Sequence, residues 1–108
     1  KGLKTIGMKA FYFCGLENLT LPDTVEVLDE KAFFKCMYLT EVTLPESIRR
    51  IEKWVFHGCG RLQILEIRHD PEYIGEWIIN RAARIRCYRG SKVDTYCQES
   101  GFTVEYIE

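Results

Sequence analysis

Three cysteines that recur at nearly constant spacing are the residues of this sequence best suited to chemistry. Cys14, Cys36 and Cys59 lie 22 and 23 residues apart. A zinc site needs clustered C-x-x-C-type spacing or convergent histidines, and a ladder of single cysteines offers neither. Disulfide bridges remain an alternative, because neighbouring strands ~4.8 Å apart bring Cα atoms within bridging range. Stacked Cβ atoms point the same way, however, so we favour reduced thiols that pack as small hydrophobes in a core.

His57 is the second chemical candidate, because it lies two residues before Cys59 and suggests a Cys–His nucleophile. The repeat places Cys59 inside, whereas His57 occupies a turn position that holds Tyr12 and Phe34 in other units. An activated thiol requires an exposed, electropositive setting, and nothing in the sequence supplies one. The sequence therefore predicts no catalytic residue, no metal ligands and no cofactor.

These residues belong to a repeat that runs through most of the chain. The segment Ala10-Phe11-x-x-Cys14 returns as Ala32-Phe33-x-x-Cys36 and again as Val55-Phe56-x-x-Cys59. Four apolar positions keep the same phase, namely Ile6, Leu28, Ile51 and Ile74. A fixed period in the twenties indicates stacked supersecondary units that share one continuous core. The predicted core ladder consists of the repeated aromatic and thiol positions, Phe11, Phe33, Phe56, Cys14, Cys36 and Cys59.

Each unit combines two apolar patterns. The first alternates with period two and predicts a short strand whose central residue faces outward. These strands are residues 19–21, 42–44 and 65–67, with Thr20, Thr43 and Glu66 at their centres. The second pattern has apolar residues three or four apart, as from Val25 to Phe33. It predicts one or two helical or irregular turns that cover the strand layer.

The last part of the chain departs from the repeat. Residues 85–87 supply a fourth strand, and Ser91 and Gly101 are suited to begin and end a helix. Residues 102–106 then alternate as a final strand. A terminal unit of this kind closes the core of a solenoid. Two cysteines of this region have apolar phase, and a disulfide between them stays open as the alternative to reduced core thiols: Cys87 and Cys97.

Size and composition exclude several classes of function. The chain has 108 residues, with 15 basic and 16 acidic residues and a net charge of −1. This balance gives no basis for binding nucleic acid. No apolar run approaches the ~20 residues that span a bilayer, so we expect no membrane insertion. Lys1 falls partway through a unit, so we expect the C-terminal end of a longer array, and self-association through its exposed first coil stays open.

The repeat can be compared with a known family. The unit I-x-x-x-A-F-x-x-C-x-x-L-x-x-V-x-L-P-x-x-I resembles the leucine-rich repeat of the BspA-like type. The closing segment Tyr88-Arg89-Gly90-Ser91-x-x-x-x-Tyr96 is similar to the G-S-x-x-x-x-Y segment that often ends such arrays. The chain departs from the pattern at four positions, Val55, Arg68, Ile78 and Ala82. The resemblance implies a surface or secreted protein that adheres to a protein or glycan on a host or neighbouring cell, without catalytic residues.

These observations together predict one α/β domain over residues 1–108, a leucine-rich-repeat-type solenoid with short parallel strands. It would have about four coils of 22–23 residues and a C-terminal helix–strand cap. The coils are expected at roughly 1–22, 23–45, 46–68 and 69–88, and the cap at 89–108.

The outward strand positions form the candidate binding face, because stacked coils each add an exposed position to a fixed frame. The face comprises two predicted columns, Asn18, Glu41, Ile64 and Arg84 beside Thr20, Thr43, Glu66 and Arg86. Aligning the strands places Arg86 beside Glu66. One alternative is an anion site on the basic stretch that runs from Arg81 to Lys92. Another is a structural spacer, with the binding site elsewhere in a larger protein.

Overall fold

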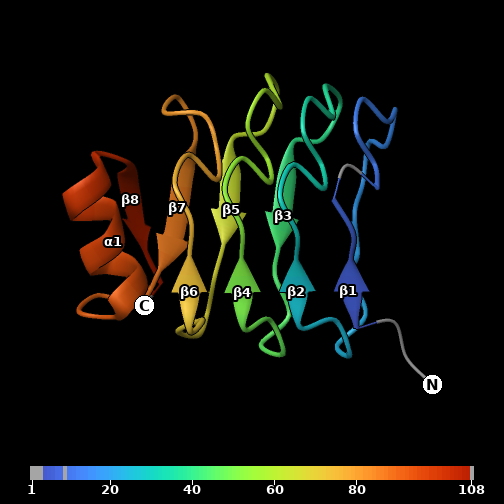
Figure 1. Ribbon diagram of the computed structural model, residues 1–108. Helices are drawn as coiled ribbons and strands as arrows, with labels where there is room; N and C mark the ends of the chain where they lie inside the picture. The colour runs from blue at the N-terminus through green and yellow to red at the C-terminus, as the bar shows by residue number, and fades with distance from the viewer. Residues whose placement is uncertain (1–3, 9, 108) are drawn as a thin grey trace.

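The chain forms a parallel-strand β-solenoid that a helix and a final strand close at the C-terminal end (Figure 1). The computed structural model describes residues 4–8 and 10–107. Its successive coils lie side by side along one axis, in the order of the sequence. This arrangement confirms the predicted repeat-type solenoid with a helix–strand cap.

Two parallel sheets form the opposite layers of the solenoid. The first has the strand order β1-β2-β4-β6 and the second the order β3-β5-β7-β8. The strands of the first sheet are β1 (Thr5–Ile6), β2 (Val27–Leu28), β4 (Arg50–Ile51) and β6 (Tyr73–Ile74). The strands of the second are β3 (Glu41–Thr43), β5 (Ile64–Glu66), β7 (Arg84–Cys87) and β8 (Thr103–Tyr106). The second, third and fourth coils therefore each contribute one strand to each layer and turn at both edges, whereas the first coil contributes β1 alone.

Of the helical or irregular turns predicted for the second apolar pattern, the structure has the irregular ones at residues 30–35, and a short strand of the first sheet replaces a helix at 27–28. The backbone around Leu28 bonds to neighbouring coils, as when the Glu52 N–H donates to the Leu28 carbonyl at 2.9 Å. In a helix, these backbone groups would bond within one coil, so the hydrogen bonds that link this part of neighbouring coils would be lost. The helix α1 (Lys92–Ser100) is the one α-helix of the described residues.

The strand expected at residues 19–21 is also corrected. These residues run along the second coil, where Thr20 lines a groove with Glu41 and Thr43. They do not form a ladder with β3, which pairs with β5 alone among the described strands. Residues 19–21 therefore alternate between inward and outward side chains, but they lack the regular hydrogen bonds that define a strand.

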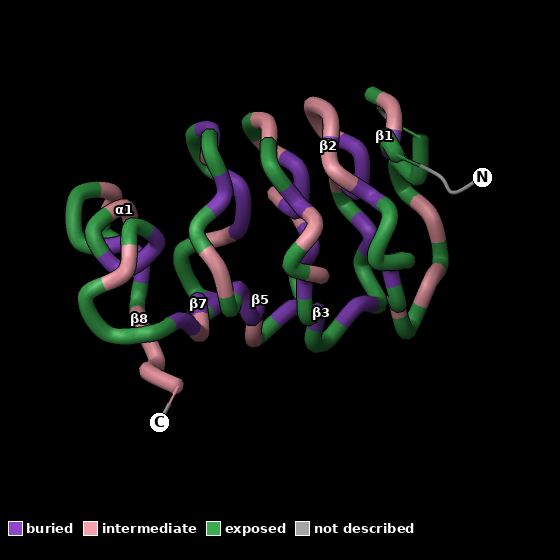
Figure 2. Tube along the Cα trace, turned by 90° about the horizontal axis from the view of Figure 1, so that it is seen from below, coloured by how far each residue is buried: buried purple, intermediate pink, exposed green. Residues whose placement is uncertain are grey.

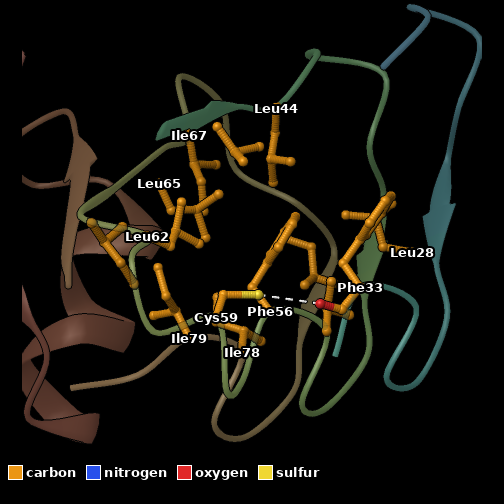
Figure 3. Packing of buried hydrophobic residues seen from close by; sticks show 14 of the residues in the cluster. Leu28, Phe33, Leu44, Phe56, Cys59, Leu62, Leu65, Ile67, Ile78 and Ile79 are labelled. Carbon is orange, nitrogen blue, oxygen red and sulfur yellow. Dashed lines mark hydrogen bonds between the residues drawn. The ribbon is translucent and has the colours of Figure 1, made fainter. Parts of the chain in front are cut away.

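The interior between the two layers is apolar, and buried residues recur in the successive coils (Figure 2). Phe33 and Phe56 are fully buried and stack with ring centroids 5.3 Å apart (Figure 3). Phe11 stacks on the other face of Phe33 at 5.1 Å but is 38% exposed, and Cys14 is half-buried. Phe11 and Cys14 thus continue the ladder but are less deeply buried than Phe33 and Cys36, because a described coil covers only one side of their turn.

The C-terminal cap has the predicted ends. Ser91 Oγ accepts a hydrogen bond from the Asp94 N–H at 3.1 Å, and Gly101 adopts a left-handed φ of 80°. Asp94 is itself buried and accepts hydrogen bonds from the Gly90 N–H at 2.8 Å and from the Tyr106 hydroxyl at 3.1 Å. The Gly90 hydrogen bond, with further bonds from Gln98 and Tyr106, lowers the pKa of Asp94. An ionised Asp94 thus ties α1 to β8.

Candidate functional site

The strands of the second sheet bring most of the predicted binding face into register. Glu41 lies beside Ile64, which lies beside Arg84. In the next column, Thr43 lies beside Glu66, and Glu66 lies beside Arg86. We call this side of the molecule the strand face, made of the outward positions of β3, β5 and β7 and the adjoining Asn18 and Thr20 (Figure 1).

Ion pairs connect the charged side chains of the strand face. Arg86 contacts Glu66 at 2.9 Å, Glu105 at 3.1 Å and Glu41 at 3.6 Å. Arg84 contacts Glu105 at 3.4 Å. The contact that the strand alignment predicts between Arg86 and Glu66 is therefore present, and it belongs to a wider network.

Glu66 departs from its predicted exposure. Its side chain points to the same face as Thr43, yet the residue is only 5% exposed because Arg68 and Arg86 cover it. Burial alone would raise the pKa of Glu66, but hydrogen bonds from Arg68 and Arg86 outweigh it and lower this pKa. Glu66 thus holds Arg68 and Arg86 in place through ion pairs, and a partner could contact Glu66 only by displacing one of these arginines.

The remaining positions of the strand face differ in how far they are accessible. The exposed ones are Asn18, Thr20, Glu41, Thr43 and Arg84, whereas Ile64 and Arg86 are half-buried. A groove of about 450 Å³ is lined by Thr20, Glu41 and Thr43, among others. Asn18 lines a second groove of about 370 Å³ together with Tyr38 and Thr40. The accessible part of the face therefore concentrates at β3 and the segment before Pro22.

The cysteines form a buried thiol ladder that has no activated nucleophile. Cys36 Sγ donates to the Phe11 carbonyl oxygen at 3.0 Å, and Cys59 Sγ donates to the Phe33 carbonyl oxygen at 3.2 Å (Figure 3). Burial raises the pKa of Cys36 to about 12 and that of Cys59 to about 11. These thiols link successive coils and stay protonated. The five cysteines, Cys87 and Cys97 included, are free in the structure.

The thiol ladder leads to a labelling prediction. With a disulfide-type thiol reagent at neutral pH, the half-buried Cys14 should react first in the native protein. A pKa near 11 at Cys59 lowers its thiolate fraction by roughly a hundredfold relative to an ordinary thiol, in addition to blocking access. Peptide mass spectrometry over time should therefore find Cys36, Cys59 and Cys97 labelled only after unfolding in urea. Fast native labelling of Cys59 would contradict the buried ladder.

The basic stretch near the C-terminus does not converge on one anion site. Arg84 and Arg86 pair with acids of the strand face, as described above. Arg81 lies over the Trp77 ring at 4.8 Å and Arg89 over the Tyr106 ring at 4.1 Å. The cations are thus engaged on different sides of the last coil and the cap.

Sequence analysis missed an aromatic cluster on the turns that follow the first sheet. His57 stacks on Phe34, with ring centroids 5.9 Å apart, and meets Trp77 edge-on at 6.3 Å. Trp54 and Trp77 recur at equivalent positions, and this signal was available in the sequence. The structure shows that Trp77 is exposed and Trp54 half-buried, which the spacing alone does not indicate.

Residues 4–8 and 10–107 contain no group of three or more His, Cys, Asp or Glu side chains arranged to hold a metal ion. The same residues include no helix with the length and apolar character of a membrane span.

Comparison with known proteins identifies the repeat. The family model described as the BspA type leucine rich repeat region matches residues 4–102, with six copies. No curated protein matches the chain. No solved structure matches it either. The family match covers nearly every described residue, including all the strands of the first sheet.

Proposed function

The chain belongs to the BspA-type leucine-rich repeat family, and from that premise we propose that it is a non-enzymatic recognition module. Its partner would be a protein, bound through the strand face, in adhesion at a cell surface. The family is typical of surface or secreted proteins, and we propose this location for the chain. Repeat scaffolds of this kind generally mediate interactions and have no catalytic site of their own.

The observation that carries this proposal is the register of the second sheet. Parallel pairing places one outward side chain per coil at a fixed position, so the face is broad and its composition varies by coil. Glu41 and Arg84, both exposed, provide opposite charges on this surface. Mixed charge on a rigid frame suits a protein partner, because charge complementarity gives specificity. The protonated thiol ladder supports a non-enzymatic role.

A structural spacer is the second candidate, and the ion-pair network favours it. Glu66, Glu105 and Arg86 satisfy one another within the face. Charges that are already paired offer less to a partner, since their mutual contacts would have to be exchanged. In this case the coils would hold or cap a binding region elsewhere in a larger protein.

A matched pair of variants separates the two candidates. Glu41→Lys/Thr43→Lys changes two exposed positions of β3 and leaves the buried Glu66 intact. Asp23→Lys/Glu46→Gln is the control, because it makes the same net charge change at exposed turn positions outside the strand face. The parent and both variants would be used to capture labelled cell-surface proteins, and the captured proteins would be quantified by mass spectrometry. The three proteins must have equal melting temperatures, so that a loss of capture does not reflect a loss of stability.

The outcomes distinguish recognition from spacing. Capture of the same protein by the parent and the control, with at least about a tenfold loss in the β3 variant, supports the strand face. Capture that the β3 variant retains would refute the strand face as the site. Absence of capture by the parent would favour the spacer.

A further inference from the structure

The turns that join the first sheet to the second lie at the upper edge of the solenoid in Figure 1. Side chains of these turns form an aromatic pocket. The pocket has a volume of about 490 Å³ and is lined by residues of three successive coils: Lys31, Phe34, Trp54, His57 and Trp77. This volume is within the range of ~300–1,000 Å³ that is typical of small-ligand sites. We call it the turn pocket, and it is separate from the strand face.

The backbone of the turn pocket adopts an unusual conformation. Lys31, Trp54 and Trp77 occupy equivalent positions in their coils and have left-handed φ angles of 59°, 65° and 54°. This conformation is uncommon for large side chains, whereas glycine and asparagine adopt it at lower energetic cost. Residues held in such conformations cluster at ligand sites. Phe13 and Lys35 also have left-handed φ angles, of 60° and 58°, so this backbone is a feature of the repeated turn. What distinguishes the pocket is that two of its three equivalent positions hold tryptophan.

The lining of the turn pocket combines ring faces with a cation. Lys31 Nζ lies 4.8 Å from the centroid of the Trp54 ring and 5.4 Å from that of Phe34. The ring of His57 continues the surface between Phe34 and Trp77. Among the described residues, Lys31 is the single lysine or arginine of the lining, and no carboxylate of these residues belongs to it. The pocket thus fits a ligand that has a flat apolar face and a negative charge.

The surroundings of the turn pocket add further positive charge. Lys53 Nζ lies 4.9 Å from the Trp54 ring centroid, Lys35 Nζ lies 5.6 Å from that of Phe34, and the Arg81 guanidinium lies 4.8 Å from that of Trp77. Three acids lie nearby, since Glu30 precedes Lys31 in the chain and Glu76 and Glu99 line an adjoining groove with Trp77 and Arg81. Cations therefore outnumber acids around the rings, and they favour an anionic ligand.

We propose that the turn pocket binds an acidic carbohydrate. The C–H faces of pyranose rings would stack on Trp54 and Trp77 by displacing the Lys31 and Arg81 side chains that lie over these rings, and a sugar carboxylate would pair with the displaced Lys31 ammonium. Carbohydrates fit the pocket better than apolar peptides do. A sugar ring has an apolar face that can contact the aromatic rings, and its polar edge can remain in water because the pocket is open. Aromatic positions that recur once per coil also match a polymer of sugar units.

Intrinsic fluorescence tests this proposal directly, because the chain has two tryptophans and both line the turn pocket. The acidic probes are short oligosaccharides that contain glucuronate, galacturonate or sialate. The neutral probe is a chitin oligosaccharide of similar length. At least one acidic probe should change the fluorescence saturably, with a Kd at least about tenfold lower than that of the neutral probe. No saturable change with any acidic probe, or equal affinity for the neutral one, would overturn the proposal.

Variants that preserve the backbone conformation locate the binding. Trp54→Asn and Lys31→Asn place asparagine, which tolerates left-handed φ, where the ring or the ammonium was. By calorimetry, Trp54→Asn should weaken binding at least about tenfold, and Lys31→Asn should reduce the preference for acidic over neutral probes. Tyr38→Asn is the matched control, since Tyr38 is an exposed ring with Arg61 over it at 5.1 Å, outside the pocket.

Two results are decisive for the location of the site. Loss of binding in Tyr38→Asn to the same extent as in Trp54→Asn would overturn the assignment to the turn pocket. The Glu41→Lys/Thr43→Lys variant should bind the acidic probe as the parent does. The proposal for the turn pocket can therefore be confirmed or refuted independently of the proposal for the strand face.

Discussion

Replacing Phe33 by alanine is expected to lower the free energy of unfolding by about 3–5 kcal/mol. Phe33 is fully buried, and its ring is stacked between those of Phe11 at 5.1 Å and Phe56 at 5.3 Å. Truncation would remove both stacking contacts and leave a cavity between coils. The backbone cannot easily close this cavity, because the Phe33 N–H donates to the Val55 carbonyl at 3.0 Å and fixes the distance between the coils. Urea unfolding followed by circular dichroism measures the loss.

Phe11→Ala is the matched control for this prediction. Phe11 has the same neighbour, Phe33, but is 38% exposed, so its truncation removes fewer contacts and opens less enclosed space. We expect a clearly smaller loss in the Phe11 variant. Equal losses at the two positions would show that burial between two coils is not what makes the phenylalanine ladder stabilising.

Replacing Gly75 by alanine is expected to destabilise the fold by about 1–3 kcal/mol or more, through a clash with backbone. A Cβ at Gly75 would lie 2.6 Å from the Lys53 backbone nitrogen and 2.9 Å from the Glu52 carbonyl carbon. Side-chain rotation cannot relieve these contacts, so the fourth coil would have to move away from the third. That movement would lengthen the hydrogen bond from the Gly75 N–H to the Ile51 carbonyl, now 2.7 Å.

The Gly75 effect should extend to the cap, because the Tyr96 hydroxyl donates to the Gly75 carbonyl oxygen at 2.7 Å. Hydrogen exchange should therefore show faster opening of α1 in Gly75→Ala. Gly60→Ala is the control, since a Cβ there would lie at an ordinary 3.7 Å from Met37 Cε. It should change stability by less than about 0.5 kcal/mol. A tolerated Gly75→Ala would mean that the third and fourth coils separate at little cost.

The repeat could be read from the sequence because its signals are local and regular. Phe33, Phe56, Cys36 and Cys59 keep one phase along the chain and are all buried in the structure. The same phase gave the pairing of Glu66 with Arg86, since strands one repeat apart must align when coils stack. Ser91 and Gly101 bound the cap helix by local hydrogen bonding, which depends on nearby residues alone.

The errors occurred where the neighbouring coil decides the structure. Leu28 and its equivalents have helical spacing, yet they lie in strands, because bonding between coils outweighs a weak local preference. Glu66 has an outward phase and is nevertheless buried, because two arginines from other positions fold over it. No pattern within one unit contains this information.

The repeat period, most of the residues that face the interior and the unit that closes the array could be predicted from the amino-acid sequence. Spacing along the chain is enough for these features, since every coil repeats the same geometry. Contacts between coils, which spacing does not contain, establish which outward residues reach solvent and which turns form the pocket around Lys31, Trp54 and Trp77. That pocket joins side chains a full repeat or more apart, and it depends on left-handed backbone angles and on how side chains of successive coils pack together.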